Sequence, residues 1–279
     1  MELNNTGRIA MPDSRKSQLV LSYLVPPWAH LTDPIPSFYS TPYDWYQTYG
    51  SLSPYLTEAV LNVPLGAFPN RATCRVLNVG CGTSQLLDNM RIDGWTGDFV
   101  NVDYSSNLID TLQKQHDASF GNKNRKTEYI CADVTKPLTM LQPESFDLII
   151  VKGTLDAVLS SAASGHAAKR MIENLHALLK PGHGVLFVVS HAGVDQRSEY
   201  FEKDGDISYY WSQVMTKTLP SRKATSSNSK DYVYICRKHE NLNHGLYDAY
   251  RSNHTQSPLR IKSVVTKDES DDNNYHASG

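Results

Sequence analysis

The sequence has no long hydrophobic run and no segment typical of a signal peptide. The longest apolar stretch near the N-terminus, residues 19–25, is far too short to cross a bilayer. The first five residues, Met-Glu-Leu-Asn-Asn, lack the basic start and apolar core of a secretory leader. We therefore expect no membrane association and a soluble protein of the cytosol or the nucleus, with the cytoplasm as the predicted location.

Cysteine is also scarce, and neither sign of charge is in large excess. The four cysteines show neither paired spacing nor a Cys/His metal pattern, which favours reduced thiols inside a cell and no metal site. The formal net charge is −2, and the short basic run at residues 123–126 resembles a solvated loop. A dominant nucleic-acid surface is therefore not expected.

The chain is long enough to bury one full-sized core. At 279 residues with 40% hydrophobic content, one α/β domain with extensions fits better than two independent domains. We expect an extended N-terminal arm over residues 1–36, the main domain over residues 37–240, and a C-terminal extension over residues 241–279. The end of that extension has too little apolar content to fold alone and is expected to be disordered.

The most informative stretch runs from Val76 to Ser84, where an apolar strand leads into two glycines one residue apart. Gly80 allows the chain to turn sharply off the strand, and Gly82 allows a ligand to approach the backbone without meeting a Cβ atom. A dinucleotide-binding loop continues to a third glycine, but that position is Gln85. The loop therefore predicts a nucleoside ligand without phosphates.

Two acids follow at the ends of the next apolar stretches. Residues 98–104 contain Asp103, about 20 residues beyond the glycine loop, where a carboxylate accepts both ribose hydroxyls of a nucleoside. Asp133 follows the next stretch and is placed to bond an adenine amino group, with the backbone N–H of Val134 on the ring. The simpler alternative is that Asp133 only caps the turn that follows it.

The remaining periodicity indicates alternating strands and helices. Residues 127–131, 146–151 and 185–189 are short apolar runs typical of parallel strands covered on both faces. Residues 107–116 and 167–179 have helical spacing, and Lys-Pro-Gly at 180–182 ends the second of these helices. The predicted fold is α/β, with a doubly wound, mostly parallel sheet.

In this order, the motifs resemble those of the class I S-adenosylmethionine-dependent methyltransferases, whose Rossmann-like sheet has seven strands. The resemblance is carried by Val-Gly-Cys-Gly at 79–82, Asp103, Cys-Ala-Asp-Val at 131–134, Phe-Asp-Leu-Ile at 146–149 and Leu-Lys-Pro-Gly at 179–182.

Three more motifs resemble the methyltransferase-like group that includes elongation factor 1-alpha lysine methyltransferases. They are Pro-Tyr-Asp-Trp-Tyr at 42–46, Val-Lys-Gly-Thr-Leu-Asp-Ala-Val-Leu at 151–159 and Asp-Tyr-Val-Tyr-Ile-Cys-Arg-Lys at 231–238. This resemblance, over about residues 38–238, implies an enzyme that methylates a protein lysine, with elongation factor 1-alpha as a candidate partner. It implies S-adenosyl-L-methionine as cofactor and S-adenosyl-L-homocysteine as product. The implied cofactor-binding residues are Gly80, Cys81, Gly82, Ser84, Asp103, Tyr104, Asp133, Val134 and Lys152.

The methyl acceptor is less constrained by the residues. An amine must lose its proton before it attacks, which requires a nearby acid or tyrosine, or desolvation. Asp156, Tyr43 and Tyr46 are the candidate catalytic residues, and the aromatic segment at 43–49 is expected to form a lid or a cation–π wall. A helix N-terminal role for Asp156 is an equal alternative. A small-molecule N-, O- or S-methyltransferase and a silent cofactor-binding scaffold also remain open.

Overall fold

The computed structural model describes residues 42–61, 70–120, 127–161, 164–201, 211–222, 229–240 and 262–263. The predicted N-terminal arm, the basic run at 123–126 and all but two residues of the predicted C-terminal extension lie outside this part. Within it, no helix combines the length and the apolar character that a membrane span requires.

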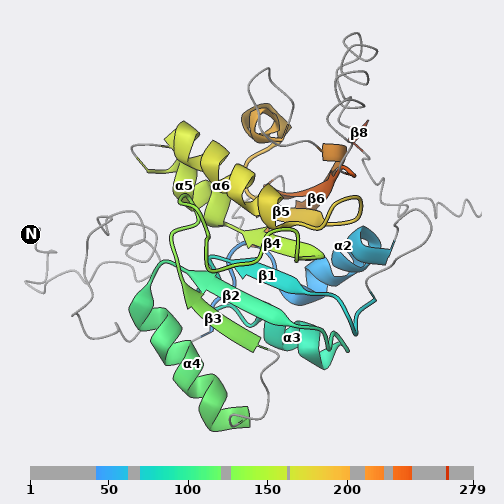
Figure 1. Cartoon of the computed structure of the whole chain (residues 1–279). Coiled ribbons are helices and arrows are strands. Elements are labelled where there is room, and N and C mark those ends of the chain that lie inside the picture. The colour runs from blue at the N-terminus through green and yellow to red at the C-terminus, as the bar shows by residue number, and fades with distance from the viewer. Residues whose placement is uncertain are drawn as a thin grey trace, which may run out of the picture.

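One mixed sheet with helices on both faces forms the body of the protein (Figure 1). The strand order is β3-β2-β1-β4-β5-β7-β6-β8. The first five strands are mutually parallel, and β7 runs antiparallel to both β5 and β6. The strands are β1 (Val76–Val79), β2 (Phe99–Asp103), β3 (Thr127–Cys131), β4 (Leu148–Lys152), β5 (Val185–Ser190), β6 (Trp211–Pro220), β7 (Lys230–Lys238) and β8 (Lys262–Ser263).

The predicted doubly wound fold is therefore confirmed, with β1 to β7 as its seven strands and the two-residue β8 added beside β6. The helices are α2 (Tyr49–Leu61), α3 (Leu86–Ile92), α4 (Ser106–Phe120), α5 (Thr154–Leu159), α6 (Ser164–Leu178) and α7 (Val194–Arg197), followed by the 3-10 turn η3 (Ser198–Tyr200). Sequence periodicity had not predicted α2, whose interior contains Pro54.

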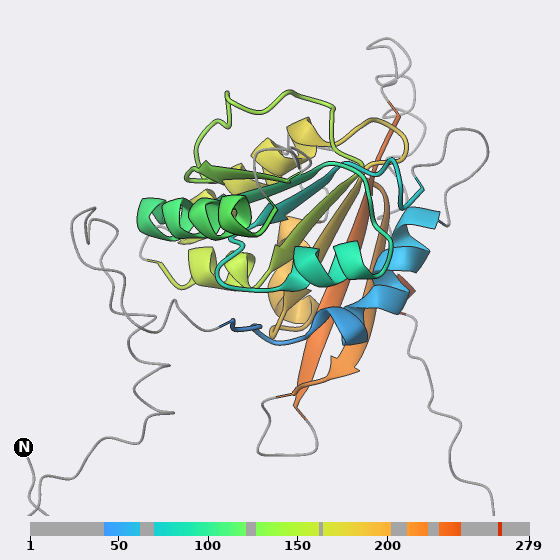
Figure 2. The same ribbon diagram turned by 90° about the horizontal axis from the view of Figure 1, so that it is seen from below.

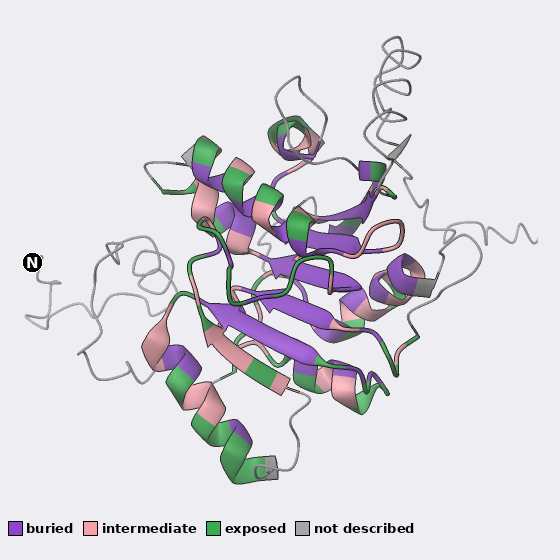
Figure 3. Ribbon diagram, in the orientation of Figure 1, coloured by how far each residue is buried: buried purple, intermediate pink, exposed green. Residues whose placement is uncertain are grey.

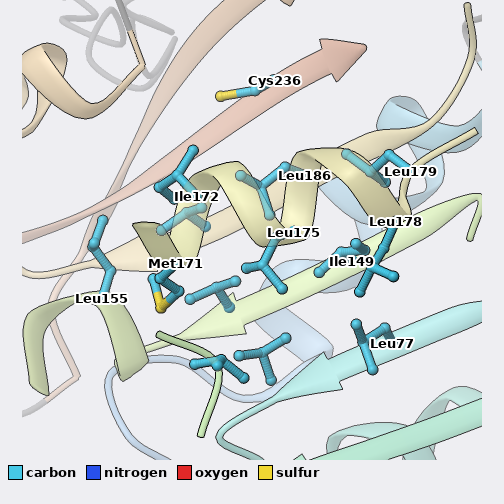
Figure 4. Close-up of a cluster of buried hydrophobic side chains, with 14 of the residues drawn as sticks. Leu77, Ile149, Leu155, Met171, Ile172, Leu175, Leu178, Leu179, Leu186 and Cys236 are labelled. Carbon is cyan, nitrogen blue, oxygen red and sulfur yellow. The ribbon is translucent and has the colours of Figure 1, made fainter. Parts of the chain in front are cut away.

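Two apolar clusters lie on opposite faces of the sheet. On one face, α5 and α6 pack their leucines and Met171 against Leu77, Ile149 and Leu186 of the central strands (Figure 4). On the other face, α2 and α3 cover a second cluster that includes Phe99 and Phe187. Figure 2 shows the strands side by side between these helix layers. Because these strands are parallel, the carboxyl ends of β1, β2, β4 and β5 all lie along the same side of the sheet.

One strand differs from expectation. Residues 127–131 were expected to be covered on both faces, but β3 lies at one edge of the sheet, and none of its residues is buried (Figure 3). The prediction was wrong because an edge strand with one covered face carries enough apolar residues to resemble a short central strand. The interior strands β2, β4 and β5 are buried along their whole length, as predicted.

Candidate functional site

The glycine loop after β1 has left-handed backbone at both glycines, with φ of +62° at Gly80 and +54° at Gly82. The two positions differ in what surrounds them. A Cβ on Gly80 would lie 2.1 Å from Thr154 Oγ1, whereas a Cβ on Gly82 would meet nothing within 4 Å. Gly80 therefore permits a close packing contact inside the protein, and Gly82 leaves open space at the loop surface.

Asp103 ends β2 directly beside this loop and is almost fully buried. One carboxylate oxygen accepts the backbone N–H of Gly82 at 3.0 Å, and the other accepts that of Ser105 at 3.0 Å. Burial raises the pKa of Asp103, while these N–H donors act in the opposite direction. Because a carboxylate oxygen accepts more than one hydrogen bond, both oxygens can take a ribose hydroxyl as well. The site thus fits a nucleoside.

The other predicted cofactor residues lie next to Asp103 and the glycine loop, or in the turn after β3. Tyr104 is exposed next to Asp103, while Cys81 is buried and its backbone N–H bonds the Val102 carbonyl at 3.1 Å. Asp133 is exposed, and its carboxylate accepts the Thr135 hydroxyl at 2.7 Å, which is the turn-capping geometry. Val134 is buried beside it. Adenine contacts of Asp133 and Val134 stay predictions.

The aromatic segment at residues 42–46 lies against the glycine loop. The Tyr43 backbone N–H donates to the Thr83 carbonyl at 3.3 Å, and the Ser84 hydroxyl bonds the Asp44 carboxylate. Asp44 also forms an ion pair of 3.1 Å with Lys152 at the end of β4. The structure therefore brings a segment near one end of the chain to the edge where open α/β sheets bind ligands.

Lys152 was predicted to bind the cofactor, and in the structure its ammonium contacts this segment. Besides Asp44, it donates to the Trp45 carbonyl at 3.2 Å, and its side chain is only 5% exposed. A buried ammonium requires such acceptors, because its desolvation is costly when they are absent. These contacts give Lys152 a positioning role, and its cofactor contact stays a prediction.

The residues after Lys152 explain why Lys-Gly-Thr-Leu-Asp forms a compact motif. Gly153 has φ of +82°, and a Cβ there would approach the Tyr46 ring to 3.3 Å. The Thr154 hydroxyl donates to the Val79 carbonyl at 2.8 Å, which joins this turn to the end of β1. Successive residues of the motif therefore contact the aromatic segment and the end of β1 that leads into the glycine loop.

Asp156, the last residue of that motif, is buried and fully engaged. Its carboxylate accepts the Ser190 hydroxyl at 2.6 Å and the Arg197 guanidinium at 2.6 Å, and its other oxygen lies 3.3 Å from His191 Nδ1. Burial opposes its ionisation, but hydrogen bonds from His191, Ser190 and Arg197 lower its pKa to about 2. A carboxyl group with so low a pKa is a poor proton acceptor near neutral pH. The geometry therefore favours a positioning role for Asp156 over the predicted catalytic role.

His191 is a functional candidate that the sequence analysis did not identify. It directly follows β5, and its Nδ1 atom lies 3.0 Å from the Tyr46 hydroxyl. The hydrogen bond that the ring makes to the Asp156 carboxylate raises the pKa of His191. A detectable signal existed: Ser190 and His191 are polar residues at the carboxyl end of a buried parallel strand, where ligand-binding residues gather. Among the residues that the structure describes, no cluster of acids, histidines and cysteines is suited to hold a metal.

Comparisons with known proteins agree on one family. A family model described as a methyltransferase domain matches residues 70–244, which is more than half of the chain. A curated relative, the eEF1A lysine and N-terminal methyltransferase of Bos taurus, is 32% identical over 119 residues, covering 42% of this chain and 14% of that protein. The match therefore spans only a small part of this longer relative.

A human relative matches over a larger share of both proteins. Citrate synthase-lysine N-methyltransferase CSKMT, mitochondrial, is 28% identical over 195 residues, covering 66% of this chain and 75% of its own length. Among solved structures, a SAM-dependent methyltransferase of Methanosarcina mazei has a TM-score of 0.45 and 16% identity, covering 63% of this chain and all of that one. PKMT2 of Rickettsia typhi in complex with AdoHcy has a TM-score of 0.40 and 23% identity, covering 57% and 29% of the two chains.

Proposed function

Because the chain belongs to the methyltransferase-domain family, we propose that it is an S-adenosylmethionine-dependent methyltransferase whose acceptor is a lysine side chain of another protein. The proposed catalytic unit spans residues 37–240. The lysine acceptor is supported by the curated relatives, whose names describe lysine methyltransferases. The cytoplasm is the proposed location; the name of the human relative places that protein in mitochondria.

The cofactor half of the proposal is supported by the glycine loop and the end of β2. Gly82 leaves open space, and the two oxygens of Asp103 are held there by backbone N–H groups. S-adenosylmethionine supplies a methyl group that its sulfonium has already activated, so the protein mainly aligns the acceptor and excludes water. Methyl transfer from a sulfonium needs neither a metal nor a covalent intermediate on the protein.

The acceptor half is carried by one observation, the bridge that Asp44 forms between Ser84 in the glycine loop and Lys152 at the end of β4. It holds two partly exposed aromatic rings beside the loop, Tyr43 and Trp45, whose centroids are 5.2 Å apart. Aromatic faces attract an ammonium by a cation–π interaction, most strongly where water is excluded. A lysine side chain has the charge and the length to use such a wall.

The proposal is tested with S-adenosylmethionine labelled with tritium in its methyl group. The protein is incubated with this cofactor and a cell extract, and protein and small-molecule fractions are then counted separately. Acid hydrolysis of the protein fraction should yield labelled methyllysine. Label confined to small molecules would refute the lysine acceptor and retain the methyltransferase, whereas cofactor binding without any transfer would indicate a silent scaffold.

The control must remove cofactor binding without unfolding the protein. A truncation of residues 1–50 is unsuitable, because Tyr49 in the first turn of α2 is buried and bonds both Asp93 and Trp95. The substitution Gly82→Val is better, since its side chain would enter open space at the loop and its cost to the fold is limited to the strain of a β-branched residue at φ of +54°. This variant should give a folded protein that transfers no label.

A further inference from the structure

The imidazole of His191 is held at one nitrogen and open at the other. Its Nδ1 atom lies 3.0 Å from the Tyr46 hydroxyl and 3.3 Å from Asp156 Oδ2. Its side chain is 56% exposed, and no hydrogen bond within the described part of the chain involves its Nε2 atom. A ring with this arrangement is fixed in orientation and still accessible to a second molecule.

The Asp156 carboxylate near Nδ1 favours one tautomer of the neutral ring. Arg197 and the Ser190 hydroxyl hold the Asp156 carboxylate as an anion, and an anion only accepts hydrogen bonds. In the tautomer that suits this anion, the proton on Nδ1 faces both Asp156 and the Tyr46 hydroxyl oxygen, and the lone pair lies on Nε2. The same logic orients histidines in catalytic sites that use a carboxylate, a histidine and a third group.

His191 also lies on the correct side of the molecule. It follows β5, which pairs in parallel with β4, so that Val189 lies beside Lys152. Tyr46, which contacts the His191 ring, follows Trp45, whose carbonyl is bound by Lys152. Strands in a sheet are about 4.8 Å apart, so the end of β5 is about 10 Å from the glycine loop after β1. An acceptor side chain between the two would span β4.

We propose that His191 is the general base of the reaction, accepting through Nε2 the proton of the acceptor ammonium, with Asp156 as its positioning residue. This inference rests on the proposed amine acceptor. The ammonium gives one proton to Nε2, and its nitrogen keeps the electron pair. That pair forms the new N–C bond while the C–S bond breaks and its electrons stay on sulfur. The imidazolium then releases the proton to water, so that one proton is liberated per methyl transferred.

The charges around His191 support a base that works near neutral pH. The hydrogen bond to Asp156 raises its pKa, desolvation lowers it, and the Asp156 charge raises it further. Arg197 acts to lower the pKa, and Asp231 on β7 acts to raise it. The net direction is upward from 6.5, toward the range in which a general base is most effective.

The first test measures the pH profile of tritium transfer into methyllysine for the wild type and His191→Gln. The wild-type rate should rise through the His191 pKa and then level off. The variant should lose about 100-fold or more near neutral pH, and its rate should climb continuously with pH, because hydroxide then removes the proton. A variant with the wild-type profile would overturn the proposal.

The matched control is His183→Gln. His183 also lies beside a carboxylate, 3.2 Å from Asp147. It precedes β5, so it lies near the amino end of the strand that His191 follows. It should retain the wild-type profile. Calorimetric titration with S-adenosylhomocysteine should give unchanged affinity for His191→Gln, which separates a lost base from a lost cofactor site.

The second test needs no turnover. Imidazole 15N chemical shifts report which ring nitrogen carries the proton, and His191 should be protonated on Nδ1 at alkaline pH. A proton on Nε2 would refute the base whatever the activity. If the wild type instead labels a small-molecule amine, the proposed lysine acceptor fails, while the same pH profile measured on that amine still decides the role of His191.

Discussion

The carboxylate of Asp44 lies 3.1 Å from the ammonium of Lys152, although 108 positions separate the two residues in the chain. Their side chains are 18% and 5% exposed, so water screens the pair only weakly. The same Asp44 bonds Ser84 in the glycine loop. One carboxylate therefore links the aromatic segment, the loop after β1 and the end of β4.

Neutralising this carboxylate should destabilise the protein. In Asp44→Asn the mostly buried Lys152 ammonium loses its charged partner, which should cost about 2 kcal/mol, between the values typical of exposed and of fully buried pairs. Adding Lys152→Met should recover most of that loss, because no unpaired charge then remains. Urea unfolding of the single and double variants measures both effects.

The control for this pair is Lys136→Met, which breaks the ion pair of Lys136 with Asp133, where the side chains are 76% and 43% exposed. Its effect on the free energy of unfolding should stay below about 0.5 kcal/mol. Equal effects of Lys136→Met and Asp44→Asn would contradict the importance given to the Asp44 bridge.

The two glycines of the loop should respond differently to alanine. Gly80→Ala forces a Cβ to within 2.1 Å of Thr154 Oγ1 and should reduce stability strongly, whereas Gly82→Ala meets nothing within 4 Å. Gly82→Ala therefore adds only the strain of a non-glycine residue with left-handed backbone, about 1–2 kcal/mol. Thermal unfolding should therefore separate the two variants. Gly82→Ala should lower the affinity for S-adenosylhomocysteine in calorimetry, and unchanged affinity would remove Gly82 from the cofactor site.

Asp103→Ala should weaken S-adenosylhomocysteine binding by about ten- to a hundredfold, which corresponds to about 1.5–3 kcal/mol, because the ribose hydroxyls lose a charged acceptor. The control is Asp98→Ala, an exposed acid that precedes the same strand at its opposite end. It should bind as the wild type does in isothermal titration calorimetry. Unaltered binding by Asp103→Ala would refute the ribose assignment.

The sequence was sufficient to predict most strands and the glycine loop, because these depend on local patterns. A buried parallel strand needs a continuous apolar run, so the predicted range 185–189 differs from β5 only by Ser190. The edge strand β3 was misplaced among the central strands because a run of residues does not reveal how many neighbours it will have. The sequence likewise predicted that the glycine loop and Asp103 follow successive strands, since the two are close in the chain.

The rest of the candidate site depends on contacts between distant residues. Nothing local indicates that Asp44 pairs with Lys152 or that Arg197 holds Asp156, because each partner resembles an ordinary surface charge in the sequence. Asp156 was accordingly taken as a candidate base, while the histidine beside it was passed over. His191 was detectable only by asking which polar residue follows each buried strand.

Asp156→Asn should reduce stability with a distinctive dependence on pH. The pKa of Asp156 is lowered from 3.8 to about 2 in the folded protein. An acid whose pKa is lower in the folded than in the unfolded protein stabilises the fold at pH values above its unfolded pKa. This contribution, about 2 kcal/mol, is lost as the pH falls from about 4 toward 2. The stabilising contribution of His191 depends on pH in the opposite direction, because its pKa is raised. That contribution is present below pH 6.5 and disappears as the pH rises through the pKa of His191 in the folded protein.

The difference in unfolding free energy between the wild type and Asp156→Asn should therefore be largest near pH 5–6, and should shrink on both sides of that range. Urea unfolding near pH 3, 5.5 and 9 measures it. Asp195→Asn, which neutralises an exposed acid on α7 nearby, is the matched control and should show a small difference at every pH. A difference for Asp156→Asn that does not change with pH would mean that neither Asp156 nor His191 titrates as their contacts indicate, and the base assigned to His191 would lose its electrostatic support.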